Sequence, residues 1–250
     1  MAFKKIAKEK LSYSSPAEIF RDLPRRKIPD VLPHQEKIME HYAEIHDKHS
    51  DIALQLPTGS GKTLVGLLIA EWRRRKFNEK IVYLCPTKQL ANQVVEQSRD
   101  KYGIPVVLLI GSQKDFSPHD ITAYKQADKI AVTTYSGLFN NNPFFKDAEI
   151  ILLDEPTTYL DLAHQLDILC LLKDLATKRN KTIVYVIHDL NHAARFADNL
   201  VLVKDGEVVE EGTVDELFTQ KTLKECFGLD VTLGCDTFTK KLMITGVKDA

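Results

Sequence analysis

Several features that mark large classes of proteins are absent or scarce in this sequence. No apolar run approaches the ~20 residues that a membrane span needs, and the N-terminal lysines are not followed by the apolar stretch of a signal peptide. The four cysteines show no CxxC spacing, and the histidines show no metal-ligand spacing. Glycine (11) and proline (10) are scarce, which excludes collagen-like and low-complexity chains. We therefore expect a cytoplasmic globular protein with free thiols.

The sequence also lacks an excess of charge of either sign. Lysine and arginine number 34 and the acidic residues 35, which leaves a net charge of −1. A protein that binds nucleic acid through an overall positive charge would have an excess of lysine and arginine, which this chain lacks. A local basic groove is still compatible with this composition. The 250 residues, 44% hydrophobic and 28% charged, suit a domain with a full core and allow one or two domains.

Strand and helix patterns alternate along most of the chain. Residues 1–30 are polar and punctuated by proline, which predicts an N-terminal arm with short helical pieces, and a helix is expected at about 35–46. Strands are predicted at 51–56, 81–85, 106–110, 129–134, 149–154 and 181–188, and helices at 62–76, 88–101, from 162 onward and at 191–196. Residues 199–212 predict a hairpin around Asp205-Gly206. The alternation predicts an α/β fold over 31–250, with a mostly parallel, doubly wound sheet and a C-terminal β-hairpin.

The strongest motif is LPTGSGKT at 56–63. It follows a predicted strand and opens a predicted helix, which is the context of a phosphate-binding P-loop. Loop N–H groups and the helix N-terminus favour phosphate oxygens, Lys62 would reach the β- and γ-phosphates, and the Thr63 hydroxyl would ligate Mg²⁺. The predicted nucleotide-binding residues are Pro57, Thr58, Gly59, Ser60, Gly61, Lys62 and Thr63. The alternative is a turn that binds nothing, since Leu56 stands where the motif has glycine.

An acidic site is predicted at the end of EIILLD (149–154). The apolar residues would carry Asp154 to the C-terminal edge of the sheet, where ligands bind in open α/β folds. Asp154 is placed to hold Mg²⁺ through water and Glu155 to orient or activate the attacking water. The alternative is a pair of helix-capping acids. The two motifs together predict a P-loop NTPase.

Residues 31–154 resemble the first motor domain of superfamily 2 helicases. The resemblance is carried by LPHQEKIMEH (32–41), LPTGSGKT, CPTKQLANQ (85–93) and VTTYSGLF (132–139). It implies a RecA-like core, ATP as the nucleotide and Gln35 as the residue that reads adenine. It also implies contacts of Thr87, Lys88, Gln89 and Thr133 with a nucleic-acid backbone, although Lys88 and Gln89 could simply be exposed at a helix start. The basic run at 73–76 is either a helix end that complements the dipole or a nucleic-acid patch.

After Asp154 the sequence resembles the C-terminal half of ABC transporter ATPases of the iron–siderophore and cobalamin importer branch. The resemblance is carried by LDEPTTYLDLAHQLDILCLL (153–172) and VIHDLNHAARFADNLVLVKDGEVVEEG (186–212), and it continues to about residue 244. It implies that Asp161 is the D-loop aspartate and that His188 contacts the γ-phosphate. The alternative for His188 is a strand-end histidine that caps its own helix together with Asp189.

Each resemblance is incomplete. No second helicase motor domain follows, and YSGLF (135–139) is the nearest string to the LSGGQ signature of ABC ATPases. Both families place one strand with a γ-phosphate sensor between the Walker A and Walker B strands, so a junction at Asp154 exchanges equivalent elements. We interpret the chain as a chimera, engineered or naturally fused, in which 31–154 is helicase-like and 155–250 ABC-like within one domain.

The expected function is binding of ATP and Mg²⁺ with slow hydrolysis. Glu155, Lys62 and His188 are the expected catalytic residues, and Thr63 and Asp154 the metal ligands. The alternatives are the ATPase subunit of an iron–siderophore importer, a nucleic-acid-stimulated ATPase, and a nucleotide-binding scaffold without turnover. We expect a monomer or weak homodimer and no permease partner, because the signature and the helical subdomain are missing.

Overall fold

The computed structural model describes residues 13–24, 26–47, 51–54, 61–148, 150–154, 162–179, 181–204 and 207–248. Its strands are β1 (Asp51–Leu54), β2 (Ile81–Cys85), β3 (Val106–Leu108), β4 (Ile130–Thr134), β5 (Ile150–Asp154), β6 (Thr182–Val186), β7 (Asn199–Lys204), β8 (Glu207–Thr213), β9 (Val231–Cys235) and β10 (Leu242–Val247). Every predicted strand is present, although β3 ends at Leu108 and β6 at Val186, before the predicted ends.

The helices are α1 (Pro16–Asp22), α2 (Pro33–Ile45), α3 (Lys62–Phe77), α4 (Lys88–Gln97), α5 (Pro118–Lys125), α6 (Tyr135–Asn140), α7 (Asn142–Phe145), α8 (Leu162–Arg179), α9 (Leu190–Phe196), α10 (Val214–Leu217) and α11 (Gln220–Phe227). A π-helical turn, η1 (Ser98–Tyr102), continues α4, and a short 3-10 helix, η2 (Gln113–Asp115), precedes α5. The predicted helices at 35–46, 62–76, 88–101, from 162 onward and at 191–196 correspond to α2, α3, α4 with η1, α8 and α9, whereas α5, α6, α7, α10 and α11 were not predicted.

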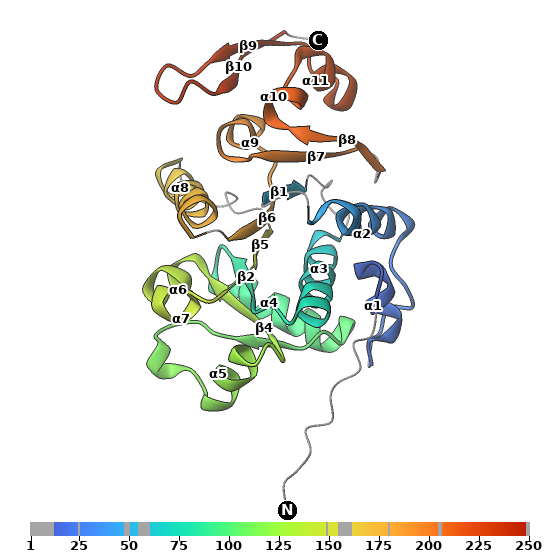
Figure 1. Ribbon diagram of the computed structural model, residues 1–250, viewed down its shortest axis with the longest axis vertical. Coiled ribbons are helices and arrows are strands. Elements are labelled where there is room, and N and C mark those ends of the chain that lie inside the picture. Colours follow the sequence, from blue (N-terminus) through green and yellow to red (C-terminus); the bar gives the residue numbers. More distant parts are fainter. Residues whose placement is uncertain are drawn as a thin grey trace, which may run out of the picture.

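The sheet has eight strands in the order β3-β4-β2-β5-β6-β1-β7-β8. Neighbours pair in parallel except β7 and β8, which form the predicted antiparallel hairpin; its turn, 205–206, lies outside the described residues. β9 and β10 form a separate two-stranded sheet beyond β7 and β8 (Figure 1). The α/β fold with a mostly parallel sheet is confirmed. β6 lies between β1 and β5, so one strand separates the strands that end at the two predicted motifs.

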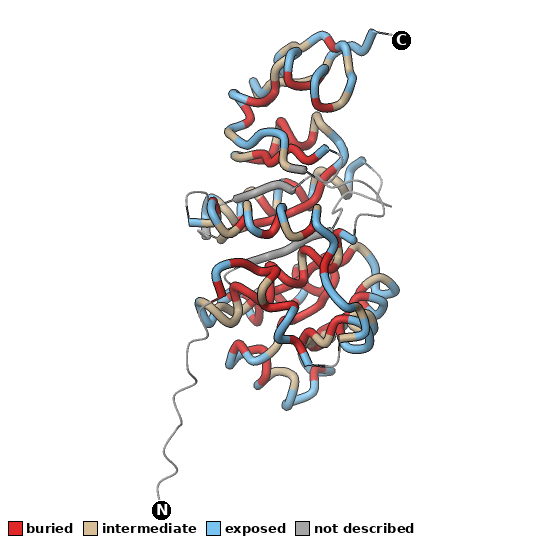
Figure 2. The backbone as a smooth tube through the Cα atoms, turned by 90° about the vertical axis from the view of Figure 1, so that its right-hand side faces the viewer, coloured by how far each residue is buried: buried red, intermediate tan, exposed pale blue. Residues whose placement is uncertain are grey.

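Two apolar layers sandwich the sheet, one on each face. Alternate residues of a strand point to opposite faces; in β2, Ile81 and Tyr83 join the layer of α1 to α4, whereas Val82 and Leu84 join the layer of the later helices. The buried backbone in Figure 2 follows the strands and the helix faces turned toward them. The sheet is therefore doubly wound, as the alternation predicts.

The segment expected to be an N-terminal arm joins the core from Tyr13 onward. Ile19 and Phe20 of α1 are fully buried, and α1 packs against α3. The Trp72 indole Nε1 donates a hydrogen bond of 3.1 Å to the Tyr13 carbonyl. Burial of these apolar groups and of the indole N–H explains why this segment covers α3. Residues 1–12, with the lysines near the N-terminus, lie outside the described residues.

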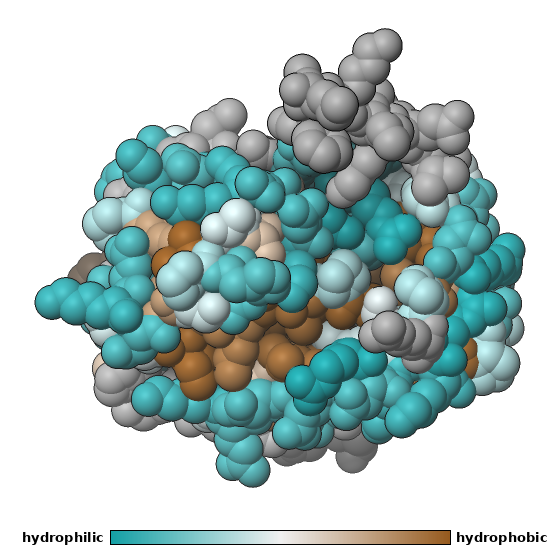
Figure 3. Space-filling view, turned by 90° about the horizontal axis from the view of Figure 1, so that it is seen from below, coloured by the Kyte–Doolittle hydropathy of each residue, from teal (hydrophilic) through white to brown (hydrophobic). Residues whose placement is uncertain are grey.

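The strand β3 forms one edge of the sheet, at the lower end of the molecule in Figure 1. Figure 3 looks onto this end and shows apolar side chains gathered in the middle of the face, with polar side chains around them. Val106 and Leu108 of β3 are half-buried. Among the described residues, no helix is long and apolar enough to cross a membrane.

Candidate functional site

The C-terminal part of the predicted P-loop is built around Gly61. This residue is the N-cap of α3 and has φ 78° and ψ 35°, a left-handed conformation that favours glycine. Its carbonyl accepts the amide N–H groups of Leu64 and Val65, which start the helix. A Cβ here would lie 2.3 Å from Gln35 Nε2. Both the backbone and the close approach of Gln35 therefore require glycine at this position.

Gln35 is held at the first turn of α2 and is only 4% exposed. Its Oε1 accepts a hydrogen bond of 3.0 Å from the Leu32 amide, as in a capping box. The nitrogen of the same carboxamide, Nε2, is the group that faces Gly61. The structure thus brings the predicted adenine-reading residue against the P-loop, a contact that the sequence motifs by themselves do not reveal.

Lys62 and His188 meet at the N-terminus of α3, although 126 residues separate them. Lys62 Nζ lies 2.6 Å from His188 Nε2; Lys62 is 8% exposed and His188 is exposed. An ammonium group has no acceptor, so Lys62 donates and His188 Nε2 accepts, which leaves the ring proton on Nδ1. The predicted phosphate-binding lysine and the predicted γ-phosphate sensor therefore share one site.

The strand order explains this meeting. β6 pairs with β5 on one side and with β1 on the other, and Asp154 at the end of β5 is opposite Val186 at the end of β6. His188 follows two residues after Val186, on the C-terminal edge where α3 begins. The alternative role of His188 as a helix cap is filled by Asp189, whose carboxylate accepts the His192 amide N–H at 2.8 Å.

Several predicted site residues lie outside the described residues. These are Pro57, Thr58, Gly59, Ser60, Glu155 and Asp161; for Asp154 the backbone is described and the side chain is not. Thr63 is half-buried in the first turn of α3. Among the described residues, no group of three His, Cys, Asp or Glu side chains could hold a metal ion.

The described part of the site fits a phosphate group. The 16-residue helix α3 begins directly after Gly61, and Lys62 supplies a buried positive charge in its first turn. Free N–H groups at a helix N-terminus and a nearby cation together attract phosphate oxygens. Thr63 would offer a hydroxyl to Mg²⁺ from the same turn.

The residues expected to contact nucleic acid do not all lie on the surface. Lys88 and Gln89 are exposed at the start of α4, and the Thr87 hydroxyl caps this helix by accepting the Leu90 amide N–H at 3.2 Å. Thr133 is fully buried in β4 and donates its hydroxyl to the Leu109 carbonyl. The expected contact of Thr133 with a nucleic-acid backbone is therefore wrong for this structure, because a central strand buries its side chain.

The three arginines of the basic run at the end of α3 are paired with two carboxylates of the protein. Arg73 forms two hydrogen bonds with the Glu79 carboxylate, at 2.6 and 2.7 Å. Arg74 and Arg75 both bind Glu71, which is completely buried. These contacts favour a structural role for the three arginines over a nucleic-acid patch, because their donor groups are already bound to carboxylates.

Comparisons with known proteins find both kinds of relative. A family model described as DEAD/DEAH box helicase matches residues 32–186. The chain is 53% identical over 93 residues to the iron(3+)-hydroxamate import ATP-binding protein FhuC of Bacillus subtilis, covering 37% of this chain and 35% of that protein. It is 33% identical over 196 residues to the probable siderophore transport system ATP-binding protein YusV of Bacillus subtilis, covering 71% of this chain and 69% of that protein.

The chain spans about a third of the length of the first curated relatives it matches, namely 35%, 33% and 35%. Among solved structures, the Hef helicase domain of Pyrococcus furiosus is 26% identical, with a TM-score of 0.46 over 67% of this chain and 33% of that chain. The family-model match runs past Asp154 to residue 186. The match to YusV covers 71% of the chain, so neither likeness is confined to one side of Asp154.

Proposed function

Because this chain belongs to the DEAD/DEAH box helicase family through residues 32–186 and to the siderophore-type ABC ATP-binding proteins through its match to YusV, we propose that it binds ATP with Mg²⁺ and hydrolyses it slowly. A P-loop ATP-binding domain is what the two families have in common. The turnover, its rate and the roles of single residues are the proposed part.

The contact between Lys62 and His188 is the observation that carries the proposal. Lys62, which precedes Asp154 in the sequence, and His188, which follows it, lie together at the N-terminus of α3. Both groups would serve the same γ-phosphate, since the sequence motifs predict a phosphate contact for Lys62 and for His188. A recombined domain that had lost this geometry would not hold them within 2.6 Å of each other.

In the proposed mechanism, Lys62 binds the β- and γ-phosphates, and the N–H groups at the start of α3 hold phosphate oxygens. Thr63 and Asp154 would hold Mg²⁺, which would supply positive charge against the charge that develops on the phosphates. Glu155 orients the attacking water, and Gln35 lies on the adenine side of the P-loop. His188 Nε2, now in contact with Lys62, would lie within reach of the γ-phosphate that Lys62 would bind.

Slow turnover is proposed because positive charges supplied by a partner domain or subunit accelerate phosphoryl transfer strongly. An arginine finger contributes ~10³–10⁵ in rate. The stretch between Lys62 and Asp154 carries the helicase-like strings CPTKQLANQ and VTTYSGLF and no LSGGQ. We accordingly propose a monomer or weak homodimer that does not need the permease of an importer. A turnover rate that climbs steeply with protein concentration would contradict the monomer.

A titration with a fluorescent ATP analogue tests the site. Lys62→Ala removes the central phosphate contact, so its affinity should fall at least about tenfold, which corresponds to 1.4 kcal/mol. Lys221→Ala is the matched control, because Lys221 is an exposed lysine on α11 that takes no part in the site. Equal affinity of Lys62→Ala and the parent would overturn the assignment.

Turnover needs its own test. Glu155→Gln keeps the size of the side chain and removes the base, so phosphate release should fall while ATP binding persists. Equal phosphate release by this variant and the parent would mean that the observed hydrolysis does not use this site. The chain would then be a nucleotide-binding scaffold.

Nucleic-acid stimulation is a second candidate, favoured by the exposed Lys88 and Gln89 at the start of α4. Single-stranded RNA added to the protein should then raise phosphate release, and Lys88→Ala should remove the increase without changing basal turnover. No change on addition of single-stranded RNA or DNA would eliminate this candidate.

A further inference from the structure

A cavity of about 100 Å³ lies beside the proposed nucleotide site. Its floor is the C-terminal end of β2, one wall is α4, and Thr63 in the first turn of α3 closes the side toward the P-loop. This is the carboxyl edge of a parallel sheet, where ligands bind in open α/β folds. β2 is paired with β5, the strand that ends at Asp154.

The cavity has an entrance and a closed end. Gln93, on α4, is exposed, whereas Tyr83 and Cys85 on the floor are 1% and 3% exposed. Leu90, Gln93 and Gln97 lie at helical spacing on one side of α4, so a single helix face lines the wall. A small molecule could thus enter past Gln93 and reach the Cys85 thiol.

The chemistry of the lining selects the ligand. None of the described residues that line the cavity is charged, so an ion would be desolvated without a countercharge. Two amide side chains project from the same wall, and Gln97 Oε1 accepts a hydrogen bond of 3.4 Å from the Tyr102 hydroxyl, which orients that amide. Amide groups pair well with a ligand that offers one donor and one acceptor side by side.

We propose that this cavity is a binding site for a small neutral molecule with an amide-like donor and acceptor. Its volume is smaller than that of a ~150 Å³ engineered cavity that takes up benzene, which limits the ligand to a few heavy atoms. Of the described residues predicted to bind nucleotide, only Thr63 lines this cavity.

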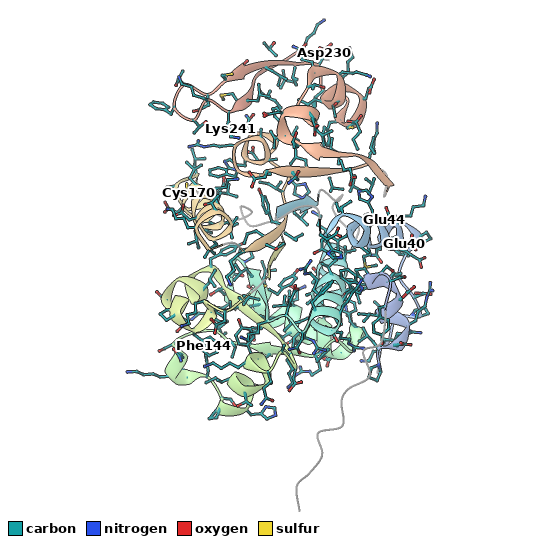
Figure 4. All side chains as sticks on the ribbon, in the orientation of Figure 1. Glu40, Glu44, Phe144, Cys170, Asp230 and Lys241 are labelled. Atoms are coloured by element: carbon teal, nitrogen blue, oxygen red, sulfur yellow. The ribbon has the colours of Figure 1, made fainter. Side chains whose placement is uncertain are left out.

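Iodoacetamide is the probe, because it is small and neutral, carries an amide and reacts with thiols. The Cys85 thiolate displaces iodide from its methylene carbon; the C–S bond forms as the C–I bond breaks, and the thiol proton passes to the buffer. The exposed thiols Cys170 and Cys235 are first replaced by serine. Figure 4 shows Cys170 on α8, on the far side of the molecule from Glu40 and Glu44 of α2. Cys226, 5% exposed with its pKa raised by burial, remains as the internal control.

Binding before reaction predicts saturation. The alkylation rate of Cys85, followed by mass spectrometry, should level off as iodoacetamide concentration rises, whereas that of Cys226 should increase linearly. Anionic iodoacetate should react with Cys85 at least about tenfold more slowly, relative to a free thiol, since the cavity offers no countercharge. Gln97→Leu should weaken the saturation, and Asn92→Leu, on the exposed side of α4, should not.

A Cys85 rate that is linear in iodoacetamide and no faster than that of Cys226 would overturn the proposal. These measurements use nucleotide-free protein, so they do not depend on ATP binding. A link to the nucleotide rests on the proposed function: carbamidomethylated Cys85 should weaken binding of the ATP analogue about fivefold or more through Thr63. Equal affinity of modified and unmodified protein would exclude that link, while failure of the unmodified protein to bind ATP would refute the proposed function instead.

Discussion

Replacing Gly61 by alanine tests how the P-loop and α2 fit together. Gly61 has φ 78°, and a Cβ there would lie 2.3 Å from Gln35 Nε2. Two separate costs follow. The left-handed backbone disfavours alanine, and the Gln35 amide must move away. Since Gln35 is 4% exposed and bonded to the Leu32 amide, it cannot move without losing that hydrogen bond.

The two costs can be estimated separately. A left-handed conformation costs a non-glycine residue about 1–2 kcal/mol. Loss of the hydrogen bond between Gln35 and Leu32 costs about 1 kcal/mol. Gly61→Ala should therefore lower the free energy of unfolding by about 2–3 kcal/mol.

Gly228 is a matched control for the backbone term. It has φ 71°, and nothing lies within 4 Å of a Cβ built there. Gly228→Ala should therefore cost about 1–2 kcal/mol, the backbone term alone. The excess at Gly61 should shrink by about 1 kcal/mol in a Gln35→Ala background, because the clash is then already removed.

The assay is urea unfolding of the single and double variants. Their free energies of unfolding are compared when the dependence of free energy on urea concentration is the same for each variant. The reasoning is refuted if the two glycine substitutions cost the same and Gln35→Ala leaves the cost at Gly61 unchanged. That result would mean that the Gln35 amide does not press on the N-terminus of α3.

The remaining predictions concern packing and pH. Glu71→Gln removes a fully buried carboxylate that holds two arginines, so we expect about 3 kcal/mol of destabilisation in denaturant unfolding; less than 1 kcal/mol would contradict that role. Asn191 binds the Ile244 main chain through both ends of its amide, at 2.7 and 3.4 Å. Asn191→Ala should speed amide hydrogen exchange in β9 and β10 and leave β2 unchanged, and uniform exchange would argue against this link. Burial, with the charge of Arg73, lowers the pKa of His46. The unfolded chain then binds a proton that the folded chain does not, so stability should fall as pH drops below about 6.5 and fall less in His46→Gln.

The elements of the fold could be predicted from local patterns. The strands around Ile81 and Ile130 are short apolar runs, and α3 follows directly from the GKT that closes the P-loop motif. Sequence patterns were less reliable for side chains that the tertiary structure buries. Thr133 matches a nucleic-acid-contacting motif, but its strand lies inside the sheet, between β3 and β2, so its hydroxyl is satisfied by the Leu109 carbonyl.

The basic run at 73–76 is a second example of what the sequence alone could not predict. The composition of this run does not distinguish a surface that binds nucleic acid from side chains that bind carboxylates of the protein itself. Glu71 stands three and four residues before Arg74 and Arg75 on the same helix, so helical spacing could have suggested these pairs, whereas Glu79 lies beyond the end of α3 and is six residues from Arg73. Only the complete burial of Glu71 decides that these arginines are structural. Likewise, the helical spacing of Gln93 and Gln97 is visible in the sequence, but the cavity beside them depends on how α4 packs on β2.

The sequence by itself predicted a P-loop and determined the alternation of strands and helices, because a P-loop motif and hydrophobic periodicity are local properties. The scarcity of cysteine, glycine and net charge likewise excluded whole classes of protein without any structure. Only the tertiary structure decided which distant residues meet. Lys62 and His188 are 126 residues apart, and they lie together because β6 inserts between β1 and β5. Strand order is set by the packing of whole layers, which no single segment of the sequence encodes.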